Sequence, residues 1–368
     1  MLEAYIRRQI EKKTFPGITI LAASRGRVDF HRWYGNRASW PAAEPLAADT
    51  LYDLASLTKP LVTAFLALVF VEKKQWRLED DVRRFLPSCP LAVSLEQLLT
   101  HSAGFRPWHP FYLYRPLDDL AQIAALPDRG AAGVRVLYSD VGYILLRHLL
   151  EKVSGSNFQQ LAAEAIFRPL RLNDTFFIVP EELKPRCAPT EIGNRYERSM
   201  AEAGHGPAAA GFAWRRELIR GDAHDANSFY AGGSAGNAGL FSSAADLFKL
   251  TREFFPVSAT LLRGESVAFF WQNRTPWDLQ GRTIGFQLNS TPRSSAGRAL
   301  AGGAIGHNGF TGTSLWLEAE GQRQWIVLTN RVHPRVKKID FNVVRRRLHR
   351  LLQLEAGAET SGKPPLEQ

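Results

Sequence analysis

The order of apolar and polar positions along the chain predicts β-strands near both ends and helices between them. In each strand-like segment apolar and polar residues alternate, and glycine stands at the turns that join neighbouring segments. Since both ends of the chain supply strands, we expect them to pair in one antiparallel sheet. The strand-like segments are 17–24 and 28–35, joined at Arg25-Gly26, then 283–289, and the two halves of 313–330, joined at Glu320-Gly321.

Helical periodicity dominates the middle of the chain. Residues 57–72 are apolar on every side, which indicates a buried central helix. Ser94 and Ser156 each precede an apolar run and stand three positions before a glutamine, as in a capping box. The segment 185–240 is rich in Gly, Ala, Asn and Pro, so we expect mostly loop there. Further helices are expected at the N-terminus (Leu2, Tyr5, Ile6 and Ile10 on one face), at 141–153, at 244–255, and at the C-terminus with Ile339, Val343, Val344, Leu348, Leu351 and Leu352 facing inward.

Together these elements predict an α+β fold. An antiparallel sheet is flanked by the N- and C-terminal helices, and the middle of the chain forms a mostly helical lobe. We expect residues 1–55 and 276–355 in the sheet lobe, 56–275 in the helical lobe, and 356–368 as a disordered tail. A cleft between two lobes is a usual location for an active site.

Composition narrows the class of protein without identifying it. The chain has 368 residues, 45% of them hydrophobic and 22% charged, which excludes a disordered, collagen-like or disulfide-scaffold protein. Lysine and arginine number 46 against 36 acidic residues, a formal charge of +10. The basic run Arg345, Arg346, Arg347 and Arg350 lies in the last predicted helix without aromatic interleaving or a binding motif. We therefore expect a solvated helix face and no nucleic-acid partner.

The cysteines and the N-terminus bear on the cellular compartment. Cys89 and Cys187 are the two cysteines of the chain, and their surroundings in the sequence do not decide whether they pair. The N-terminal segment lacks the apolar core and cleavage site of a secretory signal, so we expect a cytoplasmic protein, or a periplasmic one if a leader has been removed. No window of 18 uninterrupted apolar residues occurs, and no membrane span is expected.

The first candidate for chemistry is the S-x-x-K pattern formed by Ser56 and Lys59 at the start of the apolar segment. At a helix N-terminus, backbone N–H groups and the helix dipole stabilise an anion. Lys59 stands three residues on, within reach of the Ser56 hydroxyl. Desolvation beside an apolar helix lowers the pKa of a lysine, which allows a neutral amine to act as a base. Taken by itself, the pattern is better explained by a capping Ser56 and a Lys59 that reaches towards solvent.

Two further segments place that pattern in a context. Residues 138–140 (YSD) precede the helix predicted at 141–153, and residues 307–309 (HNG) precede a strand. In order and spacing the three segments resemble the S-x-x-K, Y-x-N and K-T-G or H-x-G motifs of the penicillin-recognising serine hydrolases, in the branch of class C β-lactamases, D-alanyl-D-alanine peptidases and family VIII esterases. Residues 98–104 (LLTHSAG) and 239–247 (GLFSSAADL) resemble further stretches of that branch, so the resemblance covers nearly the whole chain.

The resemblance implies a β-lactamase/transpeptidase-like fold and a catalytic role for four matching residues. Ser56 would be the acylated nucleophile, and Lys59 would take its proton. Tyr138 would act as a second relay that delivers the proton to the leaving group. His307 would occupy the K/H position of the third motif and polarise the site from the opposite wall.

The resemblance also implies how the substrate would be held. The backbone N–H groups of Ser56 and Phe310 would form an oxyanion hole, each donor contributing about 3 kcal/mol in comparable sites. Asp140, Asn308 and Gly309 would complete the substrate-binding set. The expected activity is hydrolysis of a small ester, amide, peptide or β-lactam through an acyl-enzyme, as an esterase or D-Ala-D-Ala peptidase, with no cofactor and no metal.

One position departs from the pattern of that branch, because the second motif ends in Asp140 instead of asparagine. An ionised carboxylate beside Lys59 raises the pKa of the lysine and opposes its role as a base. Either burial keeps Asp140 protonated, or Tyr138 carries more of the base work, or the preferred substrate bears no carboxylate. A simpler alternative is that Asp140 caps the helix at 141–153, since aspartate is among the best caps.

Several alternatives remain open at the level of the sequence. Residues 232–236 (GGSAG) match the G-x-S-x-G elbow of an α/β-hydrolase, in which Ser234 would be the nucleophile, yet no apolar strand precedes them. His101 is interpreted as a partner of a helix C-terminus rather than a catalytic group. A binding protein that keeps the fold without activity is the remaining hypothesis. The alternatives also include Asp278 with His307 or His333 as partners of Ser234, and Asp222, His224 and Asp225 as a metal site, for which a polar loop is the preferred interpretation.

Overall fold

A single antiparallel sheet built from both ends of the chain organises the structure. The computed structural model describes residues 1–87, 89–114, 119–126 and 130–360. The sheet has seven strands in the order β3-β2-β1-β9-β8-β7-β6, and a separate two-stranded ladder pairs β4 with β5. The strands are β1 Gly17–Ser24, β2 Arg27–Ala38, β3 Glu44–Pro45, β4 Tyr52–Asp53, β5 Phe241–Ser242, β6 Gln287–Leu288, β7 Ile305–Asn308, β8 Ser314–Glu318 and β9 Arg323–Thr329.

The two faces of the sheet belong to two different hydrophobic clusters. On β1, Leu21 and Ala23 pack into the larger cluster, whereas Ile18, Ile20 and Ala22 pack into the smaller one. This division follows from the two-residue period of a strand, which sends successive side chains to opposite faces. Both faces of β1 are covered, so the strand is buried along most of its length. Its sequence is accordingly almost entirely apolar.

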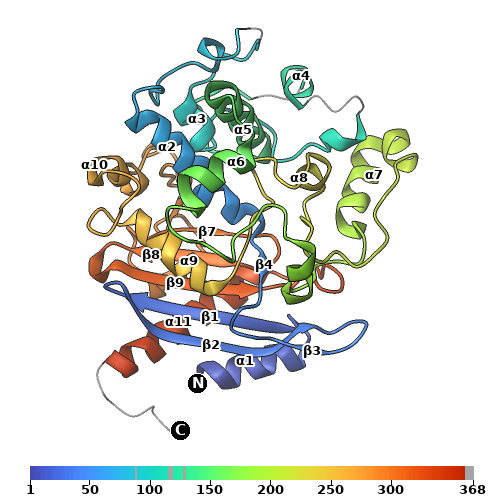
Figure 1. Ribbon diagram of the computed structural model, residues 1–368, viewed down its shortest axis with the longest axis vertical. Coiled ribbons are helices and arrows are strands. Elements are labelled where there is room, and N and C mark those ends of the chain that lie inside the picture. The colour runs from blue at the N-terminus through green and yellow to red at the C-terminus, as the bar shows by residue number, and fades with distance from the viewer. Residues whose placement is uncertain (88, 115–118, 127–129, 361–368) are drawn as a thin grey trace.

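Helices cover both faces of the sheet, as Figure 1 shows. The first and last helices, α1 and α11, contact each other and β2 below the sheet in this view, while α9 contacts β1 and β9 on the opposite face. The helices are α1 Leu2–Glu11, α2 Phe65–Glu72, α3 Leu95–Leu99, α4 Asp119–Ala124, α5 Asp140–Ser154, α6 Phe158–Ala162, α7 Arg195–Ala210, α8 Ala226–Tyr230, α9 Ala244–Thr251, α10 Gly264–Val267 and α11 Phe341–Thr360.

The apolar segment predicted as one buried helix is buried, but it changes its geometry along its length. A 3₁₀ turn at Ala55–Leu57 leads into a π-helical turn at Lys59–Ala64, and α2 follows. Wide helical turns of this kind are frequent at functional sites. The stretch Ala55–Glu72 is the one segment within the described residues that is long and apolar enough to cross a membrane, and 83% of it is buried inside the protein, as expected for a core helix.

Several local predictions were wrong. The predicted capping box at Ser156 is replaced by Asn157, whose side chain accepts from the N–H of Gln160. Helix α7 lies within the segment that was expected to be loop. Its glycines and its proline are typical of loops, and the helix accommodates them with a kink at Gly206. The tail expected from Ala356 begins inside α11, which runs to Thr360, and residues 361–368 lie outside the described part. Ile339 and Val343, which were expected to face inward in the last helix, are exposed. The strand expected at 283–289 is confined to Gln287–Leu288.

Candidate active site

Ser56 lies in the tight turn between β4 and the central helix. The residue before it, Ala55, has φ +47°, a left-handed conformation that is unusual for a residue with a side chain. The Thr58 hydroxyl donates to the Ala55 carbonyl oxygen over 2.7 Å and closes the turn. Ser56, the expected nucleophile, therefore lies on a strained turn, and it lines a cleft together with Tyr138 and His307.

Lys59 lies directly beneath Ser56 and is fully buried. Its Nζ donates to Ser56 Oγ over 3.0 Å and to the backbone oxygen of Asn237 over 2.9 Å. The same Nζ is 2.6 Å from Asp140 Oδ1. The lysine does not reach towards solvent, and the Asp140 carboxylate is engaged with Lys59 rather than with the end of α5, whose N-cap is Ser139.

The charges of this buried pair are coupled. Burial by itself lowers the pKa of Lys59, but Asp140 and Tyr138 outweigh it and hold that pKa above its usual value. Burial raises the pKa of Asp140, and Lys59 opposes this rise. At neutral pH we therefore describe the resting pair as an ammonium and a carboxylate in contact, and the lysine must lose a proton before it can act as a base.

Tyr138 stands over Lys59, with its ring centroid 5.0 Å from Nζ. Burial raises the pKa of the phenol against the opposing effects of Lys59 and Ser56, so the resting group is neutral. Behind it, His101 packs on Tyr138 at 4.5 Å between ring centroids, and its Nδ1 accepts from the Ser139 N–H over 3.1 Å. Burial lowers the pKa of His101 well below its usual value. A neutral, stacked imidazole does not act as a cationic partner of a helix end, so that interpretation was wrong; His101 supports Tyr138 instead.

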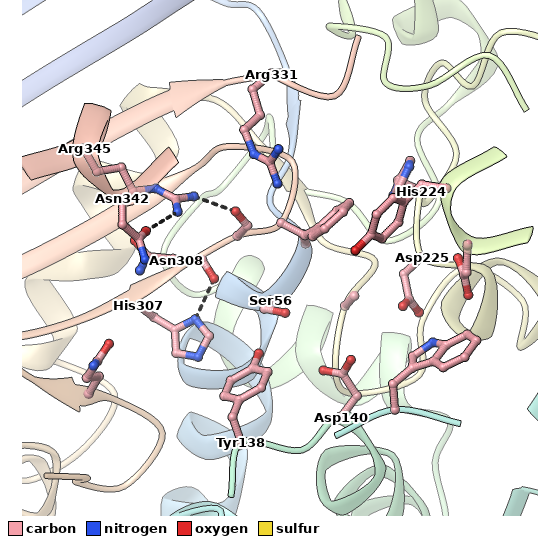
Figure 2. Close-up of a pocket in the computed structure, with 18 of the residues that line it drawn as sticks. Ser56, Tyr138, Asp140, His224, Asp225, His307, Asn308, Arg331, Asn342 and Arg345 are labelled. Atoms are coloured by element: carbon pink, nitrogen blue, oxygen red, sulfur yellow. Dashed lines mark hydrogen bonds between the residues drawn. The ribbon is translucent and has the colours of Figure 1, made fainter. Parts of the chain in front are cut away.

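His307 faces Tyr138 from β7 on the other side of the nucleophile. The two ring centroids are 5.8 Å apart, and His307 Nδ1 lies 3.0 Å from the Asn308 carbonyl oxygen (Figure 2). Burial, reinforced by Lys59 and Arg282, lowers the pKa of His307 well below its usual value. His307 is therefore a neutral polar group at the site, and Nδ1–H is the tautomer that satisfies the contact with the carbonyl.

The turn after β7 is fastened to the turn that carries Ser56. The Thr313 hydroxyl donates to the Leu54 carbonyl oxygen over 3.1 Å, and the Thr311 hydroxyl donates to the Asp53 carbonyl oxygen over 2.7 Å. Between them, Gly309 comes so close that a Cβ would lie 2.0 Å from Thr313 Oγ1 and 2.5 Å from the Leu54 carbonyl oxygen. These contacts bring the Phe310 turn up against the Ser56 turn.

Gly309→Ala is expected to separate the two turns, since the added methyl overlaps both Thr313 and the Leu54 carbonyl. We expect turnover of any accepted substrate to fall by about 10²-fold, as for a small misplacement of reacting groups. Steady-state kinetics measures this effect. Gly303→Ala is the matched control, because a Cβ there meets nothing within 4 Å. Equal activity of the two variants would contradict the close approach as a requirement for activity.

The cleft above Ser56 has a volume of about 440 Å³ and is charged differently on its two sides. Figure 2 shows Arg331 and Arg345 on one side of Ser56 and Asp140 and Asp225 on the other. The remaining residues that line it include aromatic and other apolar side chains. They are Ala55, Trp108, Tyr138, Tyr196, Glu197, Met200, His224, Ala238, Arg282, Gln287, His307, Asn308, Gly309, Phe310 and Asn342.

The basic side includes a residue that the sequence pattern placed on a solvated helix face. Arg345 is 6% exposed, and its guanidinium donates to the carbonyl oxygens of Gly309 (2.7 Å) and Thr313 (2.9 Å). The prediction was wrong for Arg345, because this part of α11 packs against the turn after β7, whose carbonyl groups need hydrogen-bond donors. Arg347 and Arg350 are exposed, as predicted. Arg331 lies over the Phe310 ring at 5.0 Å.

The acidic side contains two carboxyl groups besides Asp140. Asp225 caps α8 through a bond from the Ser228 N–H. Burial, with Asp225 adding to it, raises the pKa of Glu197 to about 8. His224, expected as a possible metal ligand, pairs with Glu191 at 3.2 Å and stacks on Phe310. In the described part of the chain no cluster of three or more His, Cys, Asp or Glu side chains could hold a metal ion.

The remaining alternatives fail on geometry. Ser234 is buried in a glycine-rich loop that follows α8, where the α/β-hydrolase elbow requires a strand followed at once by a helix. The same loop carries Asn237, the backbone acceptor of Lys59, and so forms the floor of the site. Cys89 and Cys187 are both buried and free.

Sequence reasoning missed two groups at this site. Arg282 is 6% exposed and lies 5.8 Å from the centroid of the Tyr138 ring, and no motif in the sequence marked it. Asp53, three residues before Ser56, is also buried, at 3% exposure. The sequence does show an acidic residue three positions before Ser56, and this could have marked Asp53. A carboxylate that is buried there must accept hydrogen bonds from neighbouring groups.

Comparison with known proteins gives this geometry a family. The model of the family described as Beta-lactamase matches residues 2–348. A putative D-alanyl-D-alanine carboxypeptidase of Escherichia coli K12 is 25% identical over 365 residues, covering 90% of this chain and 82% of that protein. Among solved structures, EstCE1, a hydrolase with promiscuous acyltransferase activity, has a TM-score of 0.74 at 18% identity, covering 95% of this chain and 97% of that one. A penicillin-binding protein homologue from Caulobacter crescentus also has a TM-score of 0.74 at 18% identity, covering 96% of each chain.

The fold and the serine–lysine site thus define a serine hydrolase of the β-lactamase/transpeptidase-like class. The chain belongs to the β-lactamase family, and the resemblance first carried by its three short motifs is confirmed. The α+β fold predicted from the alternating pattern is confirmed by the same comparison. An α/β-hydrolase that uses Ser234 is excluded by the fold.

Proposed function

We propose that the protein hydrolyses small acyl substrates through a covalent ester on Ser56. The observation that carries the proposal is the contact of a buried Lys59 Nζ with Ser56 Oγ at 3.0 Å and with Asp140 at 2.6 Å. A nucleophile held against a base that is itself oriented by a third group is the arrangement that activates a serine. Within it, Lys59 in its neutral amine form takes the hydroxyl proton as Ser56 attacks the substrate carbonyl.

The other steps follow from the groups around Ser56. The oxyanion of the tetrahedral intermediate lies between the backbone N–H groups of Ser56 and Phe310, which the fastened turns bring together. Tyr138, a neutral phenol above Lys59, relays the proton to the leaving group. Water then attacks the acyl ester, and Lys59 serves again as its base. His307 stays neutral and offers a hydrogen bond from the facing wall.

We further propose that the substrates are small amides with a free carboxylate next to the scissile bond, as in D-alanyl-D-alanine peptides. Arg331, Arg345 and Arg282 line the side of the cleft at the third motif, where a guanidinium suits a carboxylate. Asp140 does not cancel this attraction, since its charge is opposed by Lys59. The Escherichia coli relative bears the name of such a carboxypeptidase. Cell-wall peptides of this kind favour the periplasm over the cytoplasm as the working compartment.

A second candidate activity is hydrolysis of simple esters. The cleft also presents Trp108, Met200 and Phe310, apolar side chains that suit an uncharged acyl group. The structural relative EstCE1 is described as a hydrolase with acyltransferase activity. An ester needs less leaving-group protonation than an amide, so this activity depends less on the proton relay.

One panel tests both proposals: p-nitrophenyl esters, nitrocefin and a D-alanyl-D-alanine peptide, with intact mass after incubation with a penicillin and with a fluorophosphonate. We expect a covalent adduct at Ser56 with at least one probe, and turnover of the carboxylated peptide. Turnover of esters alone would support the second candidate. Folded protein that gives neither adduct nor turnover would contradict both, and would favour a binding protein of the same fold.

A further inference from the structure

Asp53 connects three parts of the cleft, although it does not line it. The residue ends β4 and is 3% exposed. Its Oδ1 accepts from the Ala55 N–H over 2.8 Å, and its Oδ2 accepts from the His224 N–H over 2.8 Å. Its backbone oxygen accepts the Thr311 hydroxyl over 2.7 Å. One buried residue thus contacts the nucleophile turn, the wall of His224 and the turn of the third motif.

The bond to Ala55 acts on the strained residue of the nucleophile turn. Ala55 has φ +47°, a left-handed conformation that is unfavourable for a residue with a side chain. Such conformations persist only where the surroundings hold them. A carboxylate that accepts the N–H of the strained residue is such a restraint, and it fixes the direction of the next N–H, that of Ser56.

The bond to His224 acts on the opposite wall. The His224 ring stacks on Phe310 with centroids 5.7 Å apart and an interplanar angle of 22°. Phe310 carries the second N–H of the proposed oxyanion hole. The two oxygens of Asp53 therefore act on both sides of the proposed oxyanion position. One oxygen holds Ala55, which precedes Ser56, and the other holds His224, which stacks on Phe310.

We propose that Asp53 is a positioning residue that sets the distance between the Ser56 turn and the Phe310 turn for acyl transfer. This inference rests on the proposed function, because it assigns the oxyanion donors to those two turns. Both oxygens of the side chain act as acceptors, since one N–H group points at each of them. Asparagine keeps the size of the side chain but turns an NH₂ donor towards one of those N–H groups.

The test is Asp53→Asn, measured on the best substrate of the panel. We expect kcat to fall by about 10²-fold, as after the loss of one oxyanion donor, with KM within about threefold of the wild type. Asp246→Asn is the matched control, because Asp246 is equally buried and accepts an N–H, that of Asp174 over 2.7 Å, at a distance from the cleft. That control is expected to lower the melting temperature and leave kcat within about twofold.

A second comparison separates positioning from general stability. Glycine adopts positive φ without strain, so Ala55→Gly added to Asp53→Asn is expected to recover part of the lost kcat. If Asp53→Asn alone does not fold, the double variant is compared with Ala55→Gly. A lower kcat is expected in the double variant, because asparagine supplies one acceptor oxygen where aspartate supplied two. Equal kcat in Asp53→Asn and the wild type, or in the fallback pair, would overturn the inference. A wild-type protein without a Ser56 adduct would instead refute the proposed function.

Discussion

Replacing Ser56 with alanine is expected to abolish both the covalent adduct and turnover. The hydroxyl is the atom that forms the acyl ester, and the contact of its oxygen with Lys59 Nζ at 3.0 Å leaves no second nucleophile in the same position. Removing a nucleophile from a serine hydrolase costs several orders of magnitude, because its partners act only as a unit. We expect a loss of at least about 10³-fold in kcat/KM, measured with the substrate found in the panel, together with an unchanged mass after probe treatment.

Ser234→Ala is the control for this experiment. Ser234 is 3% exposed in the glycine-rich loop beneath the site and has no part in the proposed chemistry. We expect its variant to keep the adduct and most of the activity. Loss of activity in Ser234→Ala with activity retained in Ser56→Ala would refute the assignment of the nucleophile.

The fold could be predicted where the hydrophobic pattern has a clear period. The hairpin predicted at 17–24 and 28–35 is found as β1 and β2, and the pair predicted at 313–330 is found as β8 and β9. These strands separate two hydrophobic clusters, so the alternation of their side chains is visible in the sequence. Helix α7 could not be found in this way, since its half-buried residues are interrupted by Gly206 and Pro207.

The candidate site could be located from short motifs, but not its contacts across the chain. The structure brings Ser56, Lys59, Tyr138 and His307 together from distant positions, as the order of the motifs predicted. The prediction of a solvated Arg345 was wrong. A helical pattern indicates on which face of the helix a residue lies, but not which carbonyl groups from other parts of the chain approach that face. The catalytic roles of Ser56, Lys59, Tyr138 and His307 are predictions that the variants test.

Asp140→Asn is expected to shift the pH dependence of activity to lower pH. The active form of Lys59 as a base is its neutral amine, and Asp140, 2.6 Å away, holds the pKa of the lysine above its usual value. The rising limb of the rate profile therefore lies at high pH in the wild type. Removing a contacting opposite charge lowers the pKa of the lysine, so the limb moves to lower pH.

The measurement is kcat/KM as a function of pH for the wild type and the variant. At neutral pH the variant should be at least about tenfold faster, because one pKa unit changes the fraction of neutral amine tenfold. Asp225→Asn is the matched control: Asp225 lines the same cleft, and asparagine replaces it equally well as the cap of α8. Since Asp225 makes no hydrogen bond or ion pair with Lys59 among the described residues, its variant should move the limb much less.

The stability of the two proteins should diverge as the pH falls below the unfolded-state pKa of a lysine, about 10.4, and this gives the experiment an independent readout. In Asp140→Asn the buried Lys59 has lost its counter-charge, so its pKa in the folded state falls below that in the unfolded state. The unfolded state then binds more protons, and the free energy of unfolding decreases as the pH falls through the unfolded-state pKa towards the folded one. If the variant shows this loss of stability yet is slower than the wild type at every pH, the raised pKa of Lys59 does not limit the rate. Asp140 would then be the group that accepts the lysine proton, and the carboxylate in the second motif would be part of the base itself.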